Sequence, residues 1–259
     1  MKILLSGALG NMGKEIIKLQ NEDIKIVCGF DRKKEEKPFP TYNDIEKIKE
    51  DVDIIIDFSN PKATLEILKY AKKTNTPIVI ATTGFNEEEN EIIKQYSKEI
   101  PIFKSANMSL DINLMADIVS KVANVLSNAD IEIIETHHKR KIDSPSGTAI
   151  LLADAINEVL EEKKNYNFDR MNKKEKRNQN EIGFSSVRGG NIVGKHEVMF
   201  FGENESLTIS HEAYSRTVFA EGAIKAAKYL IDKPNGLYNM KDIVKDWYSK
   251  YQFFSNLNF

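Results

Sequence analysis

Short apolar runs alternate with longer amphipathic segments through the first hundred residues. Runs rich in β-branched residues are typical of buried strands, and they lie at 3–6, 24–30, 53–58, 77–81 and 101–103. Apolar residues at helical spacing predict helices at 11–20, 61–73 and 86–98, the second entered through Ser59-Asn60-Pro61, a cap followed by proline. This alternation predicts a doubly wound, Rossmann-like parallel sheet.

The pattern changes after residue 107. It predicts a long helix at 110–126, a strand at 131–136 and a helix at 148–161. Three strands follow at 181–188, 192–201 and 206–211, joined through glycine-containing turns, before a helix at 217–231 that Pro234-Asn235-Gly236 ends. We therefore expect a dinucleotide-binding domain over 1–108, completed by the returning segment 217–259, and a smaller α+β domain with a mixed sheet over 109–216.

Two segments fall outside these patterns. Residues 162–180 are rich in lysine and asparagine, which is typical of a solvated loop, and Tyr166 and Phe168 are too few aromatics to indicate a nucleic-acid surface. Residues 247–259 are rich in aromatics, and we expect this tail to pack on the first domain or at an interface.

Composition narrows the function classes. Among 259 residues, 37 basic side chains nearly balance 39 acidic ones, so the chain has no global attraction to nucleic acid or to an acidic membrane. Cys28 is the single cysteine, which excludes an intrachain disulfide and a multi-cysteine metal site. The sequence has no run of about 18 apolar residues. We expect a cytoplasmic protein without membrane or nucleic-acid partners.

The first apolar run leads directly into glycines at positions 7, 10 and 13, followed by a helical segment. Such a turn lets the backbone approach a pyrophosphate, which the N–H groups of the helix start then hold. The glycine spacing departs from the usual pattern, and a purely structural turn is the alternative. The order of strand, turn and helix favours a dinucleotide site.

The second strand ends at Asp31, followed at once by Arg32. A carboxylate here favours the ribose hydroxyls of NADH, whereas Arg32 suits the 2′-phosphate of NADPH or is only a surface charge. The cofactor is therefore NADH, NADPH or both. Two further loops, 81–85 and 105–109, follow strands and are either in reach of the nicotinamide half or ordinary turns and caps.

Residues 135–149 form the densest group of titratable side chains. His137 and His138 are adjacent on a predicted strand, so they point to opposite faces and are unsuited to one metal ion; we expect no metal site. Histidine suits proton transfer near neutral pH, and the cations at 139–141 suit an anionic substrate. Gly147 and Thr148 begin a helix, whose N-terminus favours a carboxylate or phosphate. The alternative is a basic surface strand leading to a capped helix.

The segment from Glu135 to Ala149, with its ETHH and KIDSPSGTA runs, resembles the signature of the dihydrodipicolinate reductase family. The glycine turn, ATTGF at 81–85, SANMS at 105–109, SVRGGNIVG at 186–194 and RTVFAEGA at 216–223 extend the resemblance, in order, over nearly the whole chain.

This resemblance implies an NADH- or NADPH-dependent reductase of lysine and diaminopimelate biosynthesis that acts on 4-hydroxy-tetrahydrodipicolinate. It also implies that the domain at 109–216 binds substrate and forms a homotetramer. His137 and Lys141 are implied as proton-transfer residues, and the substrate carboxylates are implied to contact His138, Lys141, Gly147 and Thr148. The implied cofactor residues are Gly7, Ala8, Leu9, Gly10, Asn11, Met12, Asp31, Arg32, Ala81, Thr82, Thr83, Ser105, Ala106, Asn107 and Met108.

The chain departs from the family pattern at a few positions. Asp111 replaces the usual glycine, Ser144 the usual alanine, and the segment before Glu181 lacks the usual glycines. Two other functions stay open: a Rossmann reductase of another small dicarboxylate, and a non-catalytic regulator that senses a dinucleotide. Intact His137 and Lys141 argue against the regulator.

Overall fold

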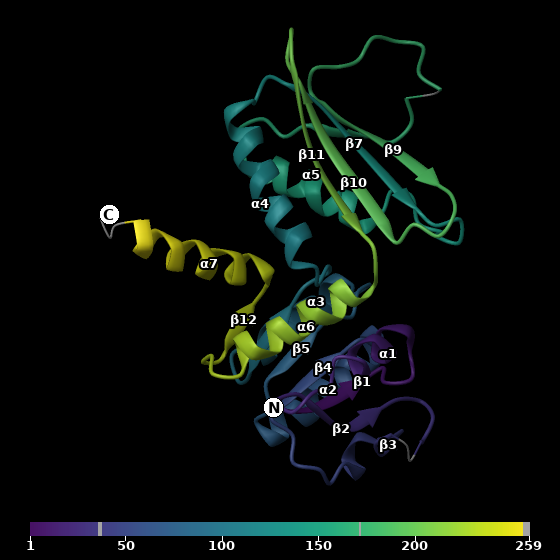
Figure 1. The fold of residues 1–259 in the computed structure, drawn as a ribbon, viewed down its shortest axis with the longest axis vertical. Helices are drawn as coiled ribbons and strands as arrows, with labels where there is room; N and C mark the ends of the chain where they lie inside the picture. Colours follow the sequence, from purple (N-terminus) through teal and green to yellow (C-terminus); the bar gives the residue numbers. More distant parts are fainter. Residues whose placement is uncertain (36–37, 171, 256–259) are drawn as a thin grey trace. The chain divides into compact units, whose positions relative to one another are not determined.

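The computed structural model describes residues 1–35, 38–170 and 172–255, and the chain divides into two units. Unit 1 comprises residues 1–110 and 216–259, and unit 2 comprises residues 111–215 (Figure 1). Of the aromatic tail, residues 256–259 lie outside the described part. Each unit has its own sheet and its own apolar core, as described below.

Unit 1 is built on a seven-stranded sheet of order β12-β6-β5-β4-β1-β2-β3, and the pairings between its named strands are all parallel. The strands are β1 (Lys2–Ser6), β2 (Lys25–Phe30), β3 (Thr41–Tyr42), β4 (Ile54–Asp57), β5 (Ile78–Ile80), β6 (Pro101–Lys104) and β12 (Gly236–Tyr238). The strand order reverses between β1 and β4. Open α/β sheets bind ligands at the carboxyl ends of the strands at such a point.

Adjacent residues of the central strands are buried on opposite faces of this sheet. In β1, Ile3 and Leu5 join one apolar core while Leu4 joins the other, and Ile54 and Ile55 of β4 are divided in the same way. Burial on both faces explains why these strands read as continuous apolar runs in the sequence. The sequence prediction of a Rossmann-like sheet is confirmed.

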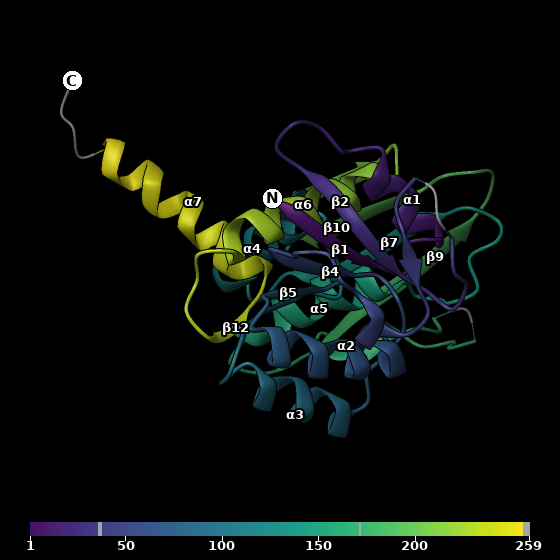
Figure 2. The same ribbon diagram turned by 90° about the horizontal axis from the view of Figure 1, so that it is seen from below.

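Two helices of unit 1, α2 (Pro61–Thr74) and α3 (Glu87–Tyr96), begin at asparagine caps that the sequence shows. The unit also contains α1 (Asn11–Ile17), α6 (Thr217–Leu230), α7 (Met240–Ser255) and the short 3₁₀ turn η1 (Ile45–Lys47). The Asn60 side chain accepts a hydrogen bond from the N–H of Ala63, and Asn86 forms a reciprocal capping box with Glu89. Helices α2 and α3 lie side by side (Figure 2).

Unit 2 contains a five-stranded mixed sheet of order β11-β10-β7-β9-β8, as predicted. The strands are β7 (Asp130–His137), β8 (Asn165–Asn167), β9 (Glu181–Arg188), β10 (Gly194–Phe201) and β11 (Ser206–Ala213). Strand β7 pairs in parallel with β9 and antiparallel with β10. The register sets Glu135 opposite His196 and His137 opposite Arg188.

One face of this sheet is covered by α4 (Leu110–Val125) and α5 (Gly147–Val159). The core between them contains Val119, Leu152 and Ile156 from the helices and Ile131, Ile133 and Val198 from the strands. In β7, residues alternate between buried and partly exposed, so Glu135 and His137 lie on the same face as the apolar core.

Residues 162–170 and 172–180, where a solvated loop is expected, make specific contacts with the sheet. They include β8, and Arg177 bonds to Asp130 at 2.7 Å and to Glu132 at 3.2 Å. Arg170 pairs with Glu181. The many basic residues that suggested a solvated loop thus include arginines that attach this segment to the sheet.

No helix among the described residues is long and apolar enough to span a membrane.

Candidate functional site

In unit 1, a cleft of about 580 Å³ lies at the carboxyl ends of β1, β2 and β4. It is lined by Ser6, Gly7 and Gly10 after β1, by Phe30, Asp31 and Arg32 after β2, by Phe58, Ser59 and Asn60 after β4, and by Asn43, Lys62, Ala63 and Glu66. The cleft therefore lies where the strand order reverses, which is the expected position for a dinucleotide.

The turn after β1 packs closely against the backbone that follows β4. Gly7 has a φ of +73°, and a Cβ there would lie 2.4 Å from the carbonyl oxygen of Phe58. Gly10 is the N-cap of α1 and has no side chain with which to cap the first turn. Backbone N–H groups at such a turn suit a pyrophosphate, so the residues present fit a dinucleotide.

Asp31 supports this turn directly. Its Oδ2 accepts a hydrogen bond from the Leu9 N–H at 3.1 Å, and its Oδ1 accepts one from the Arg32 N–H at 2.7 Å. Ala8, by contrast, is fully buried in the core. Within the predicted set at the turn, the structure brings Gly7, Gly10, Asp31 and Arg32 to the cleft.

The other two predicted cofactor loops meet at a smaller hollow of about 130 Å³, lined by Thr82, Thr83, Gly84, Phe85, Asn90, Lys104 and Ala106. Some predicted residues here have structural contacts. The Thr82 hydroxyl bonds to buried Asp57 at 3.1 Å, Asn107 Oδ1 accepts the Ser109 N–H at 2.8 Å, and Met108 is buried in the core.

In unit 2, a buried network surrounds Glu135, whose exposed fraction is 1%. His137 Nδ1 lies 2.5 Å from Glu135 Oε2, and Arg188 donates two hydrogen bonds to the same carboxylate at 2.7 and 2.8 Å. The Ser146 N–H donates to Glu135 Oε1 at 3.2 Å. One carboxylate therefore holds His137, Arg188 and the start of α5 together.

The network sets the ionisation of Glu135. Burial alone raises the pKa of this carboxyl group, but hydrogen bonds from His137 and Arg188 outweigh it and hold the pKa well below the ordinary value. An ionised carboxylate can only accept hydrogen bonds, so His137 carries its proton on Nδ1. Nε2 is the ring nitrogen that does not contact the carboxylate.

The ring edge that carries Nε2 faces Gly194. A Cβ at residue 194 would lie 3.0 Å from His137 Nε2 and 3.6 Å from His196 Cε1. A side chain here would crowd this nitrogen, so the glycine leaves it room.

His196 packs edge-on against His137, with ring centroids 5.1 Å apart. Its Nε2 lies 2.9 Å from the Ser146 hydroxyl, which also accepts the Ala149 N–H as the N-cap of α5. Burial, followed by the neighbouring His137, lowers the pKa of His196 to about 3. His196 is therefore a neutral packing partner for the network at physiological pH.

The charged loop after β7 is held to the turn after β9. The N–H of His138 donates to the Ile192 carbonyl at 2.8 Å, and the N–H of Gly189 donates to the His137 carbonyl at 2.9 Å. Arg140 donates to Asn191 Oδ1 at 3.0 Å. These bonds place the glycine-rich turn beside the histidines, although the two are about 50 residues apart in the sequence.

Lys141 forms an ion pair with Asp143 at 2.8 Å, and its side chain is one-fifth exposed. Gly147 is the first residue of α5, and Thr148 follows it. The predicted substrate residues thus lie on one continuous stretch of unit 2, from the end of β7 to the start of α5.

Glu135, Arg188, Ser146 and His196 were not among the predicted site residues. Glu135 and Ser146 fall within the family signature, and Arg188 falls within SVRGG. The sequence therefore shows these residues, but it does not show which side chains they contact. Asp111, the departure from the usual glycine, lies in the first turn of α4. Burial lowers the pKa of His211, and Asp111 partly offsets this effect.

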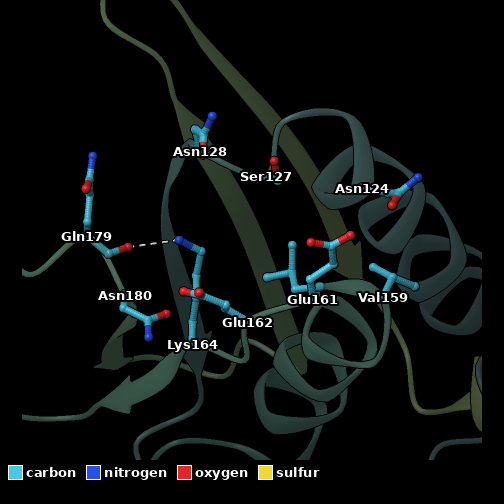
Figure 3. A pocket seen from close by; sticks show the side chains of 10 residues that line it. Asn124, Ser127, Asn128, Val159, Glu161, Glu162, Lys164, Gln179 and Asn180 are labelled. Atoms are coloured by element: carbon cyan, nitrogen blue, oxygen red, sulfur yellow. Dashed lines mark hydrogen bonds between the residues drawn. The ribbon is translucent and has the colours of Figure 1, made fainter.

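A further polar cleft of about 500 Å³ lies elsewhere in unit 2, where α4 and α5 end (Figure 3). Lys164 is buried there and donates to the Gln179 carbonyl at 2.8 Å. The predicted substrate residues do not line this cleft; they lie at the opposite end of α5. Lys164 helps to hold residues 162–180 in place.

Comparison with known proteins gives consistent results. The family model for the N-terminus of dihydrodipicolinate reductase matches residues 1–108, and the model for its C-terminus matches residues 111–244. The 4-hydroxy-tetrahydrodipicolinate reductase of Caldanaerobacter subterraneus subsp. tengcongensis is 50% identical over 247 residues, covering 95% of this chain and 98% of that protein. The corresponding protein of Clostridium novyi is 45% identical, covering 94% and 98%.

Among solved structures, the dipicolinate-bound dihydrodipicolinate reductase from Paenisporosarcina sp. TG-14 superposes with a TM-score of 0.77. It is 25% identical in sequence, and the match covers 92% of this chain and 97% of that chain.

Proposed function

The chain belongs to the dihydrodipicolinate reductase family, and on this premise we propose how its own residues carry out the reaction. The enzyme reduces 4-hydroxy-tetrahydrodipicolinate to tetrahydrodipicolinate with NADH or NADPH, in lysine and diaminopimelate biosynthesis. The substrate gains a hydride and a proton and loses its 4-hydroxyl group as water. The observation that carries the residue assignment is the buried Glu135–His137–Arg188 network within the family signature.

The glycine turn of unit 1 holds the dinucleotide through backbone N–H groups, and Asp31 fixes this turn through Leu9. Gly7, Ala8, Leu9, Gly10, Asn11, Met12, Asp31 and Arg32 form the adenosine and pyrophosphate side of this site. Ala81, Thr82, Thr83, Ser105, Ala106, Asn107 and Met108 form or support the nicotinamide side. When bound, the dinucleotide supplies the hydride.

His137 transfers a proton through Nε2. Glu135 accepts the hydrogen bond from Nδ1 and so fixes the tautomer and the orientation of the ring, while Arg188 keeps Glu135 ionised and in place. Histidine is the side chain that most often serves as a general acid or base. His137 contacts the reacting groups, whereas Glu135 and Arg188 act through it.

Lys141 has two roles, as a second proton donor and as a cation for a substrate carboxylate. It is paired with Asp143, so a bound carboxylate competes with Asp143 for the ammonium group. His138 and the backbone N–H groups of Gly147 and Thr148, at the start of α5, bind the substrate carboxylates. The dipicolinate bound in the Paenisporosarcina enzyme is a dicarboxylate and supports this assignment.

We also propose that the chain forms a homotetramer in the cytoplasm. One face of the unit 2 sheet packs on α4 and α5. On the other face, Val187 and Phe201 are 48% and 39% exposed, and Ile134 and Met199 are partly exposed. The apolar side chains on this otherwise mixed face suit contact with a second copy.

The test is oxidation of NADH and NADPH, followed at 340 nm, with substrate generated in place by the upstream synthase. We expect oxidation only when the synthase product is present. Normal nucleotide binding without oxidation would overturn the reductase in favour of a dinucleotide-sensing regulator. Oxidation with another small dicarboxylate, and none with the synthase product, would reassign the substrate.

A further inference from the structure

Two cations of the unit 1 cleft have no acidic partner among the residues that the structure describes. Arg32 follows β2, and Lys62 lies in the first turn of α2; both are exposed and line the cleft. Among the described residues, neither side chain forms an ion pair. Two unpaired cations at one cleft are suited to an anionic group of a ligand.

The two acidic side chains at this cleft, Asp31 and Glu66, differ in position and in the hydrogen bonds that they accept. Both oxygens of Asp31 already accept backbone hydrogen bonds, from Leu9 and from Arg32. Its carboxylate is therefore partly occupied in supporting the glycine turn rather than directed only at a ribose hydroxyl. Glu66 lies four residues beyond Lys62, about 6 Å further along α2 and away from its N-terminus.

The start of α2 adds to the positive potential. This helix has 14 residues and begins at Pro61, directly after the cleft-lining residues 58–60 that follow β4. Its dipole favours a negative charge at the N-terminal end, where Lys62 lies. Lys62 and the helix start therefore act in the same direction.

We propose that Lys62 and Arg32 together bind the 2′-phosphate of NADPH, so that the chain binds NADPH more tightly than NADH. The proposal rests on the dinucleotide site of the proposed function and names Lys62 as a determinant of cofactor preference. Asp31 then serves mainly to shape the glycine turn, and its presence does not exclude the phosphate.

The test compares two ligands that differ only in the 2′-phosphate, adenosine 2′,5′-bisphosphate and AMP, by isothermal titration calorimetry. We expect wild type to prefer the bisphosphate. Lys62→Met should weaken bisphosphate binding about fivefold, as for a partly solvated charge pair, and change AMP binding less than about twofold. The difference should shrink as salt is raised.

Three variants act as controls. Lys62→Arg should keep the preference, because the charge remains. Lys69→Met changes an exposed lysine of the same helix that does not line the cleft, so both affinities should stay unchanged. Glu66→Gln removes the opposing charge and should strengthen bisphosphate binding.

Equal binding of the two ligands by wild type, binding of neither, or an unchanged ratio in Lys62→Met would overturn the proposal. These results are separate from the reaction itself. An enzyme that turns over normally but shows an unchanged ratio contradicts only the role of Lys62. A Lys62-dependent ratio in a protein that does not oxidise the cofactor contradicts only the proposed reaction.

Discussion

The carboxyl ends of two central strands, β1 in unit 1 and β7 in unit 2, are built from different groups. Backbone groups dominate at the first, and side chains dominate at the second. The turn after β1, in unit 1, is made of glycines and backbone N–H groups and depends on shape. The carboxyl end of β7, in unit 2, instead carries charged side chains gathered around the buried Glu135. A site made of backbone is sensitive to added volume, whereas a site made of buried charge is sensitive to the loss of one partner.

The difference fits the two functions that we propose for these regions, nucleotide binding and proton transfer. A pyrophosphate can be bound by N–H groups that every residue carries, provided that the chain can approach it closely. Proton transfer needs a specific side chain in a fixed tautomer, which in turn needs a partner on its other nitrogen. The comparison therefore predicts that added volume destabilises the turn after β1, whereas loss of one charge destabilises the end of β7. The changes in the free energy of unfolding should differ in size.

Glu135→Gln should have the largest effect. It keeps the shape but removes the charge, leaving Arg188 without its carboxylate in a buried site, and we expect a loss of about 4 kcal/mol in urea unfolding. Glu132→Gln is the matched control. Glu132 also lies on β7 and also pairs with arginines, but its side chain is more exposed, at 25%. Its loss should be about 1 kcal/mol.

Wild type and Glu135→Gln can also be compared as a function of pH. The pKa of Glu135 is lowered on folding, so its stabilising effect is complete above the unfolded value, near pH 4.5, and is lost as the pH falls below it. The advantage of wild type over Glu135→Gln should therefore shrink under acid conditions. An advantage that is constant from pH 7 to 3 would contradict the ionised network.

Gly7→Ala should rank second, with a loss of about 3 kcal/mol from the left-handed backbone and from the clash with the Phe58 carbonyl. Gly84→Ala isolates the first cause, because Gly84 has a φ of +87° and nothing within 4 Å of an added Cβ. It should cost about 1 kcal/mol. Equal losses in the two variants would show that close approach at the turn is unimportant.

His196→Gln should have the smallest effect, and only in acid. The folded pKa of about 3 lies below the ordinary 6.5, so between these values the unfolded chain binds a proton that the folded chain does not. Wild type should lose about 2 kcal/mol between pH 7 and pH 5 from this residue. Glutamine does not titrate, so the variant should show a flatter profile over this range, and an identical slope would contradict the assignment.

The sequence predicted the elements that have long, regular patterns. The strands of unit 1 appear near their expected positions because burial on both faces gives continuous apolar runs. Helix α1 ends at Ile17, three residues earlier than predicted. Strands β3, β8 and β12 have only two or three residues each, too few for a periodic pattern, and were not predicted.

Helix α7 was missed for a different reason. Its amphipathic spacing begins at Met240, but the many aromatic residues near the C-terminus make its pattern less regular than that of the other helices. The structure shows Met240 and Ile243 in the core of unit 1, so the part of α7 that precedes the aromatic tail is packed on that unit. Trp247 is half-exposed.

Site residues were predicted where a residue type itself suggests chemistry, as with His137 and Lys141. Glu135 and Arg188 were overlooked because their role depends on strand register, which places Arg188 opposite His137 across β7 and β9. Thr82 is a further residue whose contact depends on the fold. Its hydroxyl looks available in the sequence, but the fold directs it to Asp57.

We assign nucleotide binding to unit 1 and proton transfer to unit 2. The most direct test of this division is to measure turnover and nucleotide affinity in one variant, Lys141→Ala, with a substitution of the exposed Lys163, Lys163→Ala, as control. We predict that kcat/KM for the dicarboxylate substrate falls by about 100-fold or more, while the dissociation constant for NADPH stays within about twofold of wild type. Near-wild-type turnover, or a parallel loss of nucleotide affinity, would contradict the account.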